Sequence, residues 1–161
     1  MVSKAGVRVL AALAVLVVSG CSTAFKGEVL TGEIVADDWR MPIAPAYDAF
    51  FDDTLYSIQR EGMVGAFQIS TVSKTGGAVT EADINKMAEP FIRRRATLES
   101  MPMADGIAYR TVFSDTGVHW RAWYFGVDNT VVFVTYSAYE RELNRAELDE
   151  IESMVARFRA T

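Results

Sequence analysis

The sequence predicts an α+β domain in which an antiparallel sheet of about five or six strands is flanked by helices. Two observations carry this prediction. Residues 106–138 contain three strand-like runs separated by the turns Asp115-Thr116-Gly117 and Asp128-Asn129. Residues 80–95, and the segment that begins near Asn144, instead space their apolar residues with a helical period.

The first half of the domain is the harder part to assign. Residues 29–36 read as a strand that Gly32 interrupts, and residues 45–53 read as a single helical turn or a short helix. Residues 54–60 and 63–72 then alternate like the two strands of a hairpin.

Residues 80–95 have a clear helical pattern. Thr80 is placed as the N-cap, and acidic residues follow it in the first turn, where they favour the positive end of a helix. Pro90 removes one helical hydrogen bond, so we expect a kink there or two short helices. The three consecutive arginines 93–95 fall near the negative helix end; a contact with an anion or a partner is the alternative explanation for them.

The meander 106–138 should place its last strand, residues 130–138, in the centre of the sheet. Apolar side chains occur on both faces of that strand, which is typical of a strand covered on both sides. The closing helix then carries its apolar stripe toward the sheet; the residues of that stripe are Leu148, Ile151, Val155 and Phe158.

The N-terminus has the organisation of a secretory signal peptide. Lys4 and Arg8 precede the uninterrupted apolar run 9–18, which as a helix would span only about half of a hydrocarbon core. We therefore predict a signal peptide over residues 1–20, a short tether over 21–27, and one globular domain over 28–161. The alternative, an amphipathic or buried N-terminal helix, is disfavoured because the run lacks a polar face.

Val18-Ser19-Gly20-Cys21 ends this segment and includes the only cysteine of the chain. It resembles the bacterial lipobox, which implies cleavage before Cys21 and attachment of a diacylglyceryl group to its thiol, with palmitate-type acylation of the new amine. Several acyl chains on one residue give stable membrane attachment. Ser22 follows the cysteine where an aspartate would resemble an inner-membrane retention signal, so we expect the outer membrane, facing the periplasm.

Charge then excludes one class of partner. Removal of residues 1–20 leaves 14 basic against 21 acidic residues, a net charge of −7. This balance does not favour nucleic acid, which rewards a basic surface. Residues 28–61 alone hold eight acidic residues against Arg40 and Arg60, which indicates either a solvated acidic edge or an acidic surface that faces a partner.

Catalytic and metal-binding motifs are absent from the sequence. It contains no G-x-S-x-G elbow, H-E-x-x-H motif, paired cysteines, calcium loop or phosphate loop, so we predict no enzyme, no cofactor and no metal site. His119 is the only histidine and reads as structural rather than catalytic. The pairs Asp37-Asp38 and Asp52-Asp53 place adjacent carboxylates on diverging side chains and are poor chelators.

The run 119–125, His-Trp-Arg-Ala-Trp-Tyr-Phe, is dense in aromatic residues. Most of these rings should belong to the core. Where a face is only partly covered, Arg121 and Trp123 become candidate partner-binding residues, because Trp and Arg dominate interface hot spots. Arg94 joins them as the third candidate.

Taken in order, the elements resemble the PsbP-like fold, an α/β/α sandwich around an antiparallel sheet. The features that carry the resemblance cover residues 37–160; they are Trp39 ahead of Pro42, the strand GAFQIS, the helix start TEADI, the strand end TYS and the final helix ending ARFR. Members of that fold mostly bind or chaperone other proteins and share no active site.

The sequence thus predicts a membrane-anchored envelope lipoprotein whose domain is a non-catalytic binder of another protein, either an assembly or maintenance factor or an immunity-type inhibitor. Two alternatives remain open. One is a cell-wall hydrolase that uses carboxylates or His119, and the other is a periplasmic carrier that holds a small ligand in an aromatic cleft.

Overall fold

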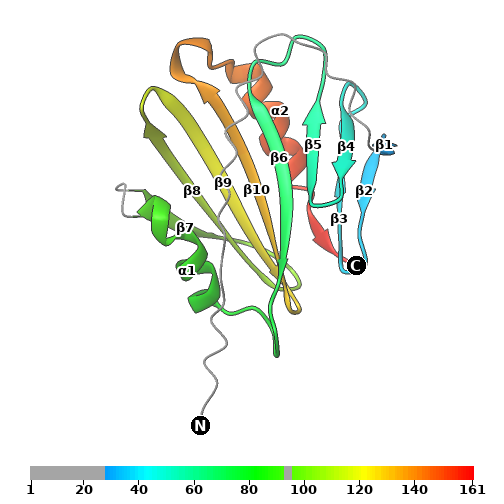
Figure 1. Ribbon diagram of the computed structural model, residues 1–161, viewed down its shortest axis with the longest axis vertical. Coiled ribbons are helices and arrows are strands. Elements are labelled where there is room, and N and C mark those ends of the chain that lie inside the picture. Colours follow the sequence, from blue (N-terminus) through cyan, green and yellow to red (C-terminus); the bar gives the residue numbers. More distant parts are fainter. Residues whose placement is uncertain (1–27, 93–95) are drawn as a thin grey trace.

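The computed structural model describes residues 28–92 and 96–161, and a large antiparallel sheet dominates it (Figure 1). The eight strands of this sheet are, from edge to edge, β1 (Glu28–Leu30), β4 (Asp48–Asp52), β5 (Leu55–Gln59), β6 (Ala66–Ser73), β10 (Thr130–Tyr139), β9 (Val118–Val127), β8 (Ile107–Asp115) and β7 (Thr97–Met101). A second, smaller sheet has the order β11 (Arg159–Ala160), β3 (Trp39–Pro42) and β2 (Glu33–Val35).

Two α-helices and one short 3₁₀ helix complete the described part of the chain. They are α1 (Glu81–Ile92), α2 (Arg145–Val155) and η1 (Glu140–Glu142). No helix within the described ranges is long and apolar enough to cross a membrane. The predicted signal peptide, the tether and Arg94 lie outside the described residues.

The expected α/β/α sandwich is wrong. Strands make up 48% and helices 20% of the structure, and the large sheet has eight strands rather than five or six. The two predicted amphipathic helices exist, but α1 and α2 have only 12 and 11 residues and each covers part of one sheet face. The two helices are therefore too short to form a complete helical layer on either face of the large sheet.

The N-terminal third accounts for most of the missing strands. The run 29–36, read as one strand, turns at Gly32, so that β1 joins the large sheet and β2 joins the small one. The segment 45–53, read as a helical turn, contains β4. Its Ala49 and Phe51 point to the inner face while Asp48, Phe50 and Asp52 point to the other, because β4 pairs with β5 in an extended register.

The C-terminal half confirms the predicted meander, but Phe158, expected on the closing helix, lies beyond α2, which ends at Val155. β8, β9 and β10 form the expected meander, and β10 is central in the large sheet. Asn144 caps α2, since its side-chain oxygen accepts hydrogen bonds from the backbone N–H groups of Ala146 and Glu147 at 3.0 and 3.3 Å. α1 is one continuous helix through Pro90, so the alternative of two short helices is wrong.

The sheet is covered differently on its two faces. α1 packs on one face, where Ile84, Ala88 and Phe91 meet the rings of Tyr124 and its neighbours on β8–β10. α2 and the small sheet pack on the other face and bury the larger core cluster. The α2-side face of β7 and β8 stays largely open there, since Arg110 and Val112 are exposed. The candidate site lies at the end of the molecule where the small sheet diverges from the large one.

Candidate functional site

A hollow of about 460 Å³ lies where the two sheets diverge at one end of the molecule. Its lining comes from the β2–β3 turn, from β4, β5 and β6, and from the start of β10; the residues are Ala36, Asp37, Asp38, Trp39, Phe51, Tyr56, Thr71, Ser73, Asn129 and Thr130. Volumes of this size are typical of small-ligand sites, which span about 300–1,000 Å³. A second hollow of about 470 Å³, on the outer side of α2, has no aromatic residue in its lining.

The large sheet supplies one wall of the hollow from a single face. Phe51 pairs with Tyr56, and Ser73 pairs with Thr130, in the registers of β4–β5 and β6–β10. Directly paired residues point to the same face, and this face also carries Val132 of the core beneath the small sheet. The strands therefore turn their aromatic and hydroxyl side chains toward the small sheet at the end where the two sheets part.

Aromatic rings form the inner part of the hollow. The rings of Phe51 and Tyr56 lie 4.5 Å apart between centroids, and Tyr56 meets the edge of Trp39 at 5.9 Å. Trp39 is 1% exposed because its ring also stacks on Phe158 at 5.6 Å. Phe51 and Tyr56 are half-buried, so their surfaces are the accessible aromatic part of the site.

The β2–β3 turn carries Asp37 and Asp38 at the mouth of the hollow. The turn is closed by the backbone hydrogen bond from Ala36 N–H to the Trp39 carbonyl at 2.9 Å. The end of the chain holds it from outside: the Thr161 N–H donates to the Asp38 carbonyl at 3.1 Å, and the Thr161 hydroxyl donates to the Asp37 carbonyl at 2.9 Å. The backbone of residues 36–39 is therefore ordered without a ligand.

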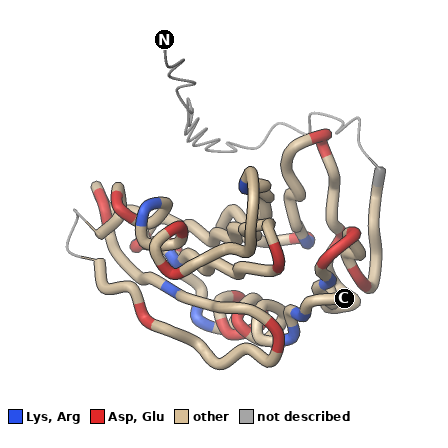
Figure 2. Tube along the Cα trace, turned by 90° about the horizontal axis from the view of Figure 1, so that it is seen from below, with Lys and Arg blue, Asp and Glu red and all other residues tan. Residues whose placement is uncertain are grey.

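Three further aspartates lie in turns at the same end of the large sheet. Asp52 and Asp53 form the β4–β5 turn, and Asp128 lies in the β9–β10 turn; β5 and β10 run parallel and both begin at this end. Figure 2 looks along the molecule from this end and marks its acidic residues in red. Within residues 28–92 and 96–161, none of these aspartates forms an ion pair, nor do Asp37 and Asp38. These five aspartates therefore concentrate unpaired negative charge at this end, which also holds Lys74 next to the β9–β10 turn and Arg40 just after the β2–β3 turn.

Thr130 adds a polar group inside the hollow. It is 8% exposed, and its hydroxyl has no hydrogen-bond partner in the described part of the chain. The oxygen is not among the buried side-chain atoms that lack a partner, so solvent reaches it within the hollow. It is an acceptor that a ligand in the hollow could use in place of water.

The site does not have the composition of a metal centre. Among the described residues no group of three or more His, Cys, Asp and Glu side chains is arranged to hold a metal ion. Asp37 and Asp38 contribute two adjacent carboxylates without a third ligand of that kind. What the arrangement can do is attract a positive charge at its mouth and pack apolar surface against its rings.

The residues that the sequence proposed for partner binding lie elsewhere. Trp123 is 3% exposed in the core beneath α2, so it offers no surface to a partner. Arg121 forms an ion pair with Glu152 of α2, at the border of the open face of β7 and β8. Burial, together with repulsion from Arg110 and Arg145, lowers the pKa of Arg121 from its ordinary value.

His119 is placed beside Arg121 on β9 and lines neither of the two hollows. Burial is the main cause that lowers its pKa, and the positive charge of Arg121 adds to the effect. Both effects disfavour the charged imidazole. Its buried Nε2 has no hydrogen-bond partner among the described residues.

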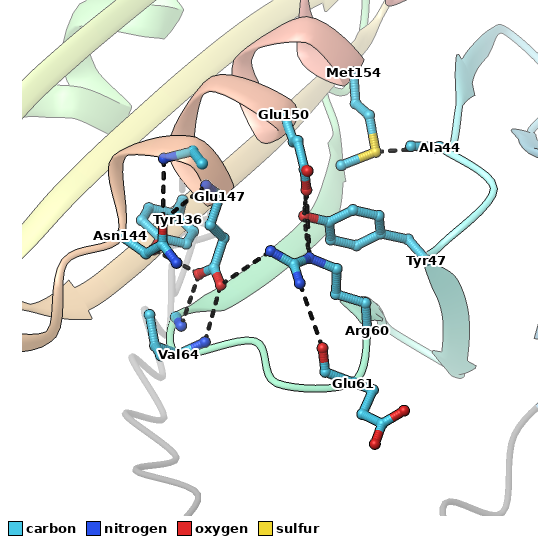
Figure 3. A network of polar contacts seen from close by, with 12 residues as sticks. Ala44, Tyr47, Arg60, Glu61, Val64, Tyr136, Asn144, Glu147, Glu150 and Met154 are labelled. Atoms are coloured by element: carbon cyan, nitrogen blue, oxygen red, sulfur yellow. Dashed lines mark hydrogen bonds and ion pairs between the residues drawn. The ribbon is translucent and has the colours of Figure 1, made fainter.

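A network around Glu147 holds the other end of the molecule together (Figure 3). Glu147 is fully buried, and its carboxylate accepts hydrogen bonds from the backbone N–H groups of Val64 and Gly65, both at 3.0 Å, and from the Tyr136 hydroxyl at 2.7 Å. Arg60 lies 3.9 Å from the same carboxylate. Because every oxygen of Glu147 is engaged, this network joins α2 to the β5–β6 turn and leaves no open group for a ligand.

Next to it, Tyr47 connects Arg60 with Glu150. The Arg60 Nε–H donates to the Tyr47 hydroxyl at 2.9 Å, and that hydroxyl donates to Glu150 at 2.6 Å. Burial, followed by the hydrogen bond to Glu150, raises the pKa of Tyr47 to about 12.

Sequence reasoning noted Asp37-Asp38 and the acidic segment but did not place them around a hollow. Phe51 and Tyr56 were not singled out at all. The signal that could have found them is the alternation in β4 and β5 that puts one ring from each strand on the same face.

Comparison with known proteins adds a fold and no function. No family model matches the chain, and no curated protein matches it. A crystal structure from Bacteroides thetaiotaomicron VPI-5482 is similar to it, with a TM-score of 0.56 and 16% sequence identity over 81% of this chain. The match covers 48% of that protein, so this chain spans about half of its length. At this identity the likeness shows the fold alone.

Proposed function

We propose that this protein is a lipoprotein of the bacterial envelope, anchored through acyl chains on Cys21, whose domain binds a basic partner protein without catalysing a reaction. The observation that carries the binding role is the group of unpaired aspartates in three turns around a lined hollow. The lipobox-like sequence carries the anchor. The expected location is the outer membrane, with the domain in the periplasm.

The electrostatic argument favours a partner over mere solvation. Unpaired charges of one sign at one end of a protein raise the rate at which an oppositely charged partner arrives and suppress wrong partners. Five carboxylates within three turns repel one another, and a basic partner relieves that repulsion. Solubility alone does not require the acidic residues to gather at one end of the domain.

The anchor is tested by replacing the proposed acylation site. We expect Cys21→Ala to lose metabolic labelling by an alkyne-tagged palmitate and to leave the membrane fraction, because the other attachment forces are weak for a domain of net negative charge. Cys21→Ser is the matched control for the size of the side chain and should behave in the same way. Unchanged membrane fractionation of both variants would refute the anchor.

The binding role is tested at the turns outside the hollow. The triple variant Asp52→Asn, Asp53→Asn and Asp128→Asn should lose retention of basic envelope proteins, and the wild-type protein should lose it as salt rises. The control, Asp48→Asn with Glu61→Gln, removes charges at the opposite end, where the Glu61 side chain points away from the Glu147 network (Figure 3). Equal retention by the triple variant, or a retained set without a basic bias, contradicts the proposed role.

A carrier of a small ligand is the second candidate, because the volume of the hollow lies in the range of small-ligand sites. A free small cation would use the same carboxylates and rings. The experiment below separates it from a protein partner.

A further inference from the structure

We propose that the hollow binds one alkylammonium or guanidinium group on an aliphatic stem, that is, a lysine or arginine side chain of the partner. This inference rests on the proposed function, since it names the part of a basic partner that the acidic end receives. It assigns to the hollow a ligand class, and it assigns roles to Asp37, Asp38, Phe51, Tyr56 and Thr130.

The lining fits both parts of such a side chain. Asp37 and Asp38 place two unpaired carboxylates at the mouth, which a cationic head can reach. Phe51 and Tyr56 present half-buried rings next to them, and aromatic faces attract cations and pack against methylene groups. Thr130 offers the open hydroxyl oxygen, an acceptor for an N–H donor.

Other ligand classes fit less well. An anion would meet two carboxylates and no positive side chain in the lining. A divalent metal would find two adjacent carboxylates in place of the larger set that it requires.

The mouth is also held in place in advance. The β2–β3 turn is closed by its own hydrogen bond and fixed by two more from Thr161. A binding site whose backbone is already ordered loses less conformational freedom when a ligand enters. Because its mouth is already ordered, the hollow can bind a single side chain with only a few contacts.

The test is an NMR titration of the full chain in detergent micelles, read at the Trp39 indole N–H and the Asn129 amide. The probes are the peptides acetyl-Gly-Lys-Gly-amide and acetyl-Gly-Arg-Gly-amide, the matched peptide with norleucine in place of lysine, and free spermidine. We expect saturable shifts with the lysine and arginine peptides and none with the norleucine peptide. Shifts that are the same for all three peptides, or absent for all, overturn the proposal.

Four variants locate the binding. The double variant Asp37→Asn with Asp38→Asn should weaken the affinity for the lysine peptide about tenfold. An exposed ion pair contributes up to about fivefold in affinity, and this variant removes two carboxylates. Thr71→Trp, at an exposed position of the lining, should fill the hollow and abolish the shifts without changing charge. Thr130→Val keeps the shape and should weaken binding about threefold, as the loss of one modest hydrogen bond does. The control Asp48→Asn with Glu61→Gln should leave affinity within about twofold, because solvent and salt screen distant exposed charges.

The outcomes separate this inference from the proposed function. If Thr71→Trp binds the peptides like wild type while the triple variant of Asp52, Asp53 and Asp128 loses basic partners, the hollow is not the site and the basic-partner role stands. If spermidine saturates the site and neither peptide binds, the hollow takes a free small cation and the proposed lysine or arginine side chain is overturned, while the basic-partner role is still decided by the triple variant. If the variants at Asp37 and Asp38 bind as wild type does, the proposal is overturned.

Discussion

Glu147→Gln should destabilise the protein strongly, because it removes a charge that three donors and one arginine surround. In the structure one oxygen accepts from Gly65 N–H and the Tyr136 hydroxyl, and the other accepts from Val64 N–H near Arg60. A glutamine amide has only one acceptor oxygen, so in either orientation its NH₂ group faces a backbone N–H. One buried donor is then left without a partner.

The magnitude follows from these contacts. A buried donor without a partner costs about 1–3 kcal/mol, and hydrogen bonds to a charged group contribute about 1.5–3 kcal/mol each. Since the surviving bonds weaken with the loss of charge, we expect a decrease in unfolding free energy of about 3–5 kcal/mol, as when one partner of a buried ion pair is removed. Against a total of about 5–15 kcal/mol this is a large fraction.

The assay is urea unfolding followed by tryptophan fluorescence. With a slope of about 2 kcal/mol/M, the midpoint should fall by about 2 M at an unchanged slope. Glu150→Gln is the matched control: its side chain is 50% exposed, so the same chemical change should cost less than about 1 kcal/mol. Equal midpoints for Glu147→Gln and wild type would refute the account of the network as a structural clamp.

Three further predictions concern the core and the tyrosines. Trp123→Ala should lower the unfolding free energy by about 3–5 kcal/mol in the same urea assay, because the ring is buried beneath α2; a loss below about 1 kcal/mol would show that the ring is not part of the core. Gly65→Ala should cost about 1–3 kcal/mol, since a Cβ there would overlap the Tyr136 ring, and a Tyr136→Leu background should remove most of that cost. Stability should also fall as the pH rises from 10 toward 12: Tyr47 ionises near 10 in the unfolded chain but near 12 when folded, so alkali favours the unfolded state, and thermal unfolding of Tyr47→Phe should show a smaller alkaline loss than wild type.

The C-terminal half of the fold was predictable because its strands are long. In β10, ten residues alternate between two buried faces, and the turns on either side of β9 carry Asp, Gly and Asn residues with positive φ or the freedom to adopt it. The N-terminal strands have three to five residues each, which is too short for a periodicity to separate strand from helical turn. The segment 45–53 was misread for this reason.

The candidate site was less predictable than the fold. Its acidic residues were visible as composition, but the hollow depends on β11, a strand of two residues that pairs with β3 from the far end of the chain. No local sequence pattern predicts a pairing between two short strands so far apart in the chain. Trp123 shows the reverse: it had the residue type of an interface anchor, and only the position of α2 decides that it is core.

The contacts made by Thr161 bear on the order in which the fold forms and on what holds the β2–β3 turn. The Thr161 hydroxyl reaches a carbonyl 124 positions earlier in the chain, and β11 closes the small sheet across a similar separation. Closing a long loop costs more entropy than closing a short one, so we expect the two carboxylates at the mouth to reach their final geometry after the meander has assembled. Loss of residues 159–161 would remove β11 and the two hydrogen bonds to the β2–β3 turn, so we expect a folded eight-stranded sheet whose Asp37 and Asp38 are no longer held in place.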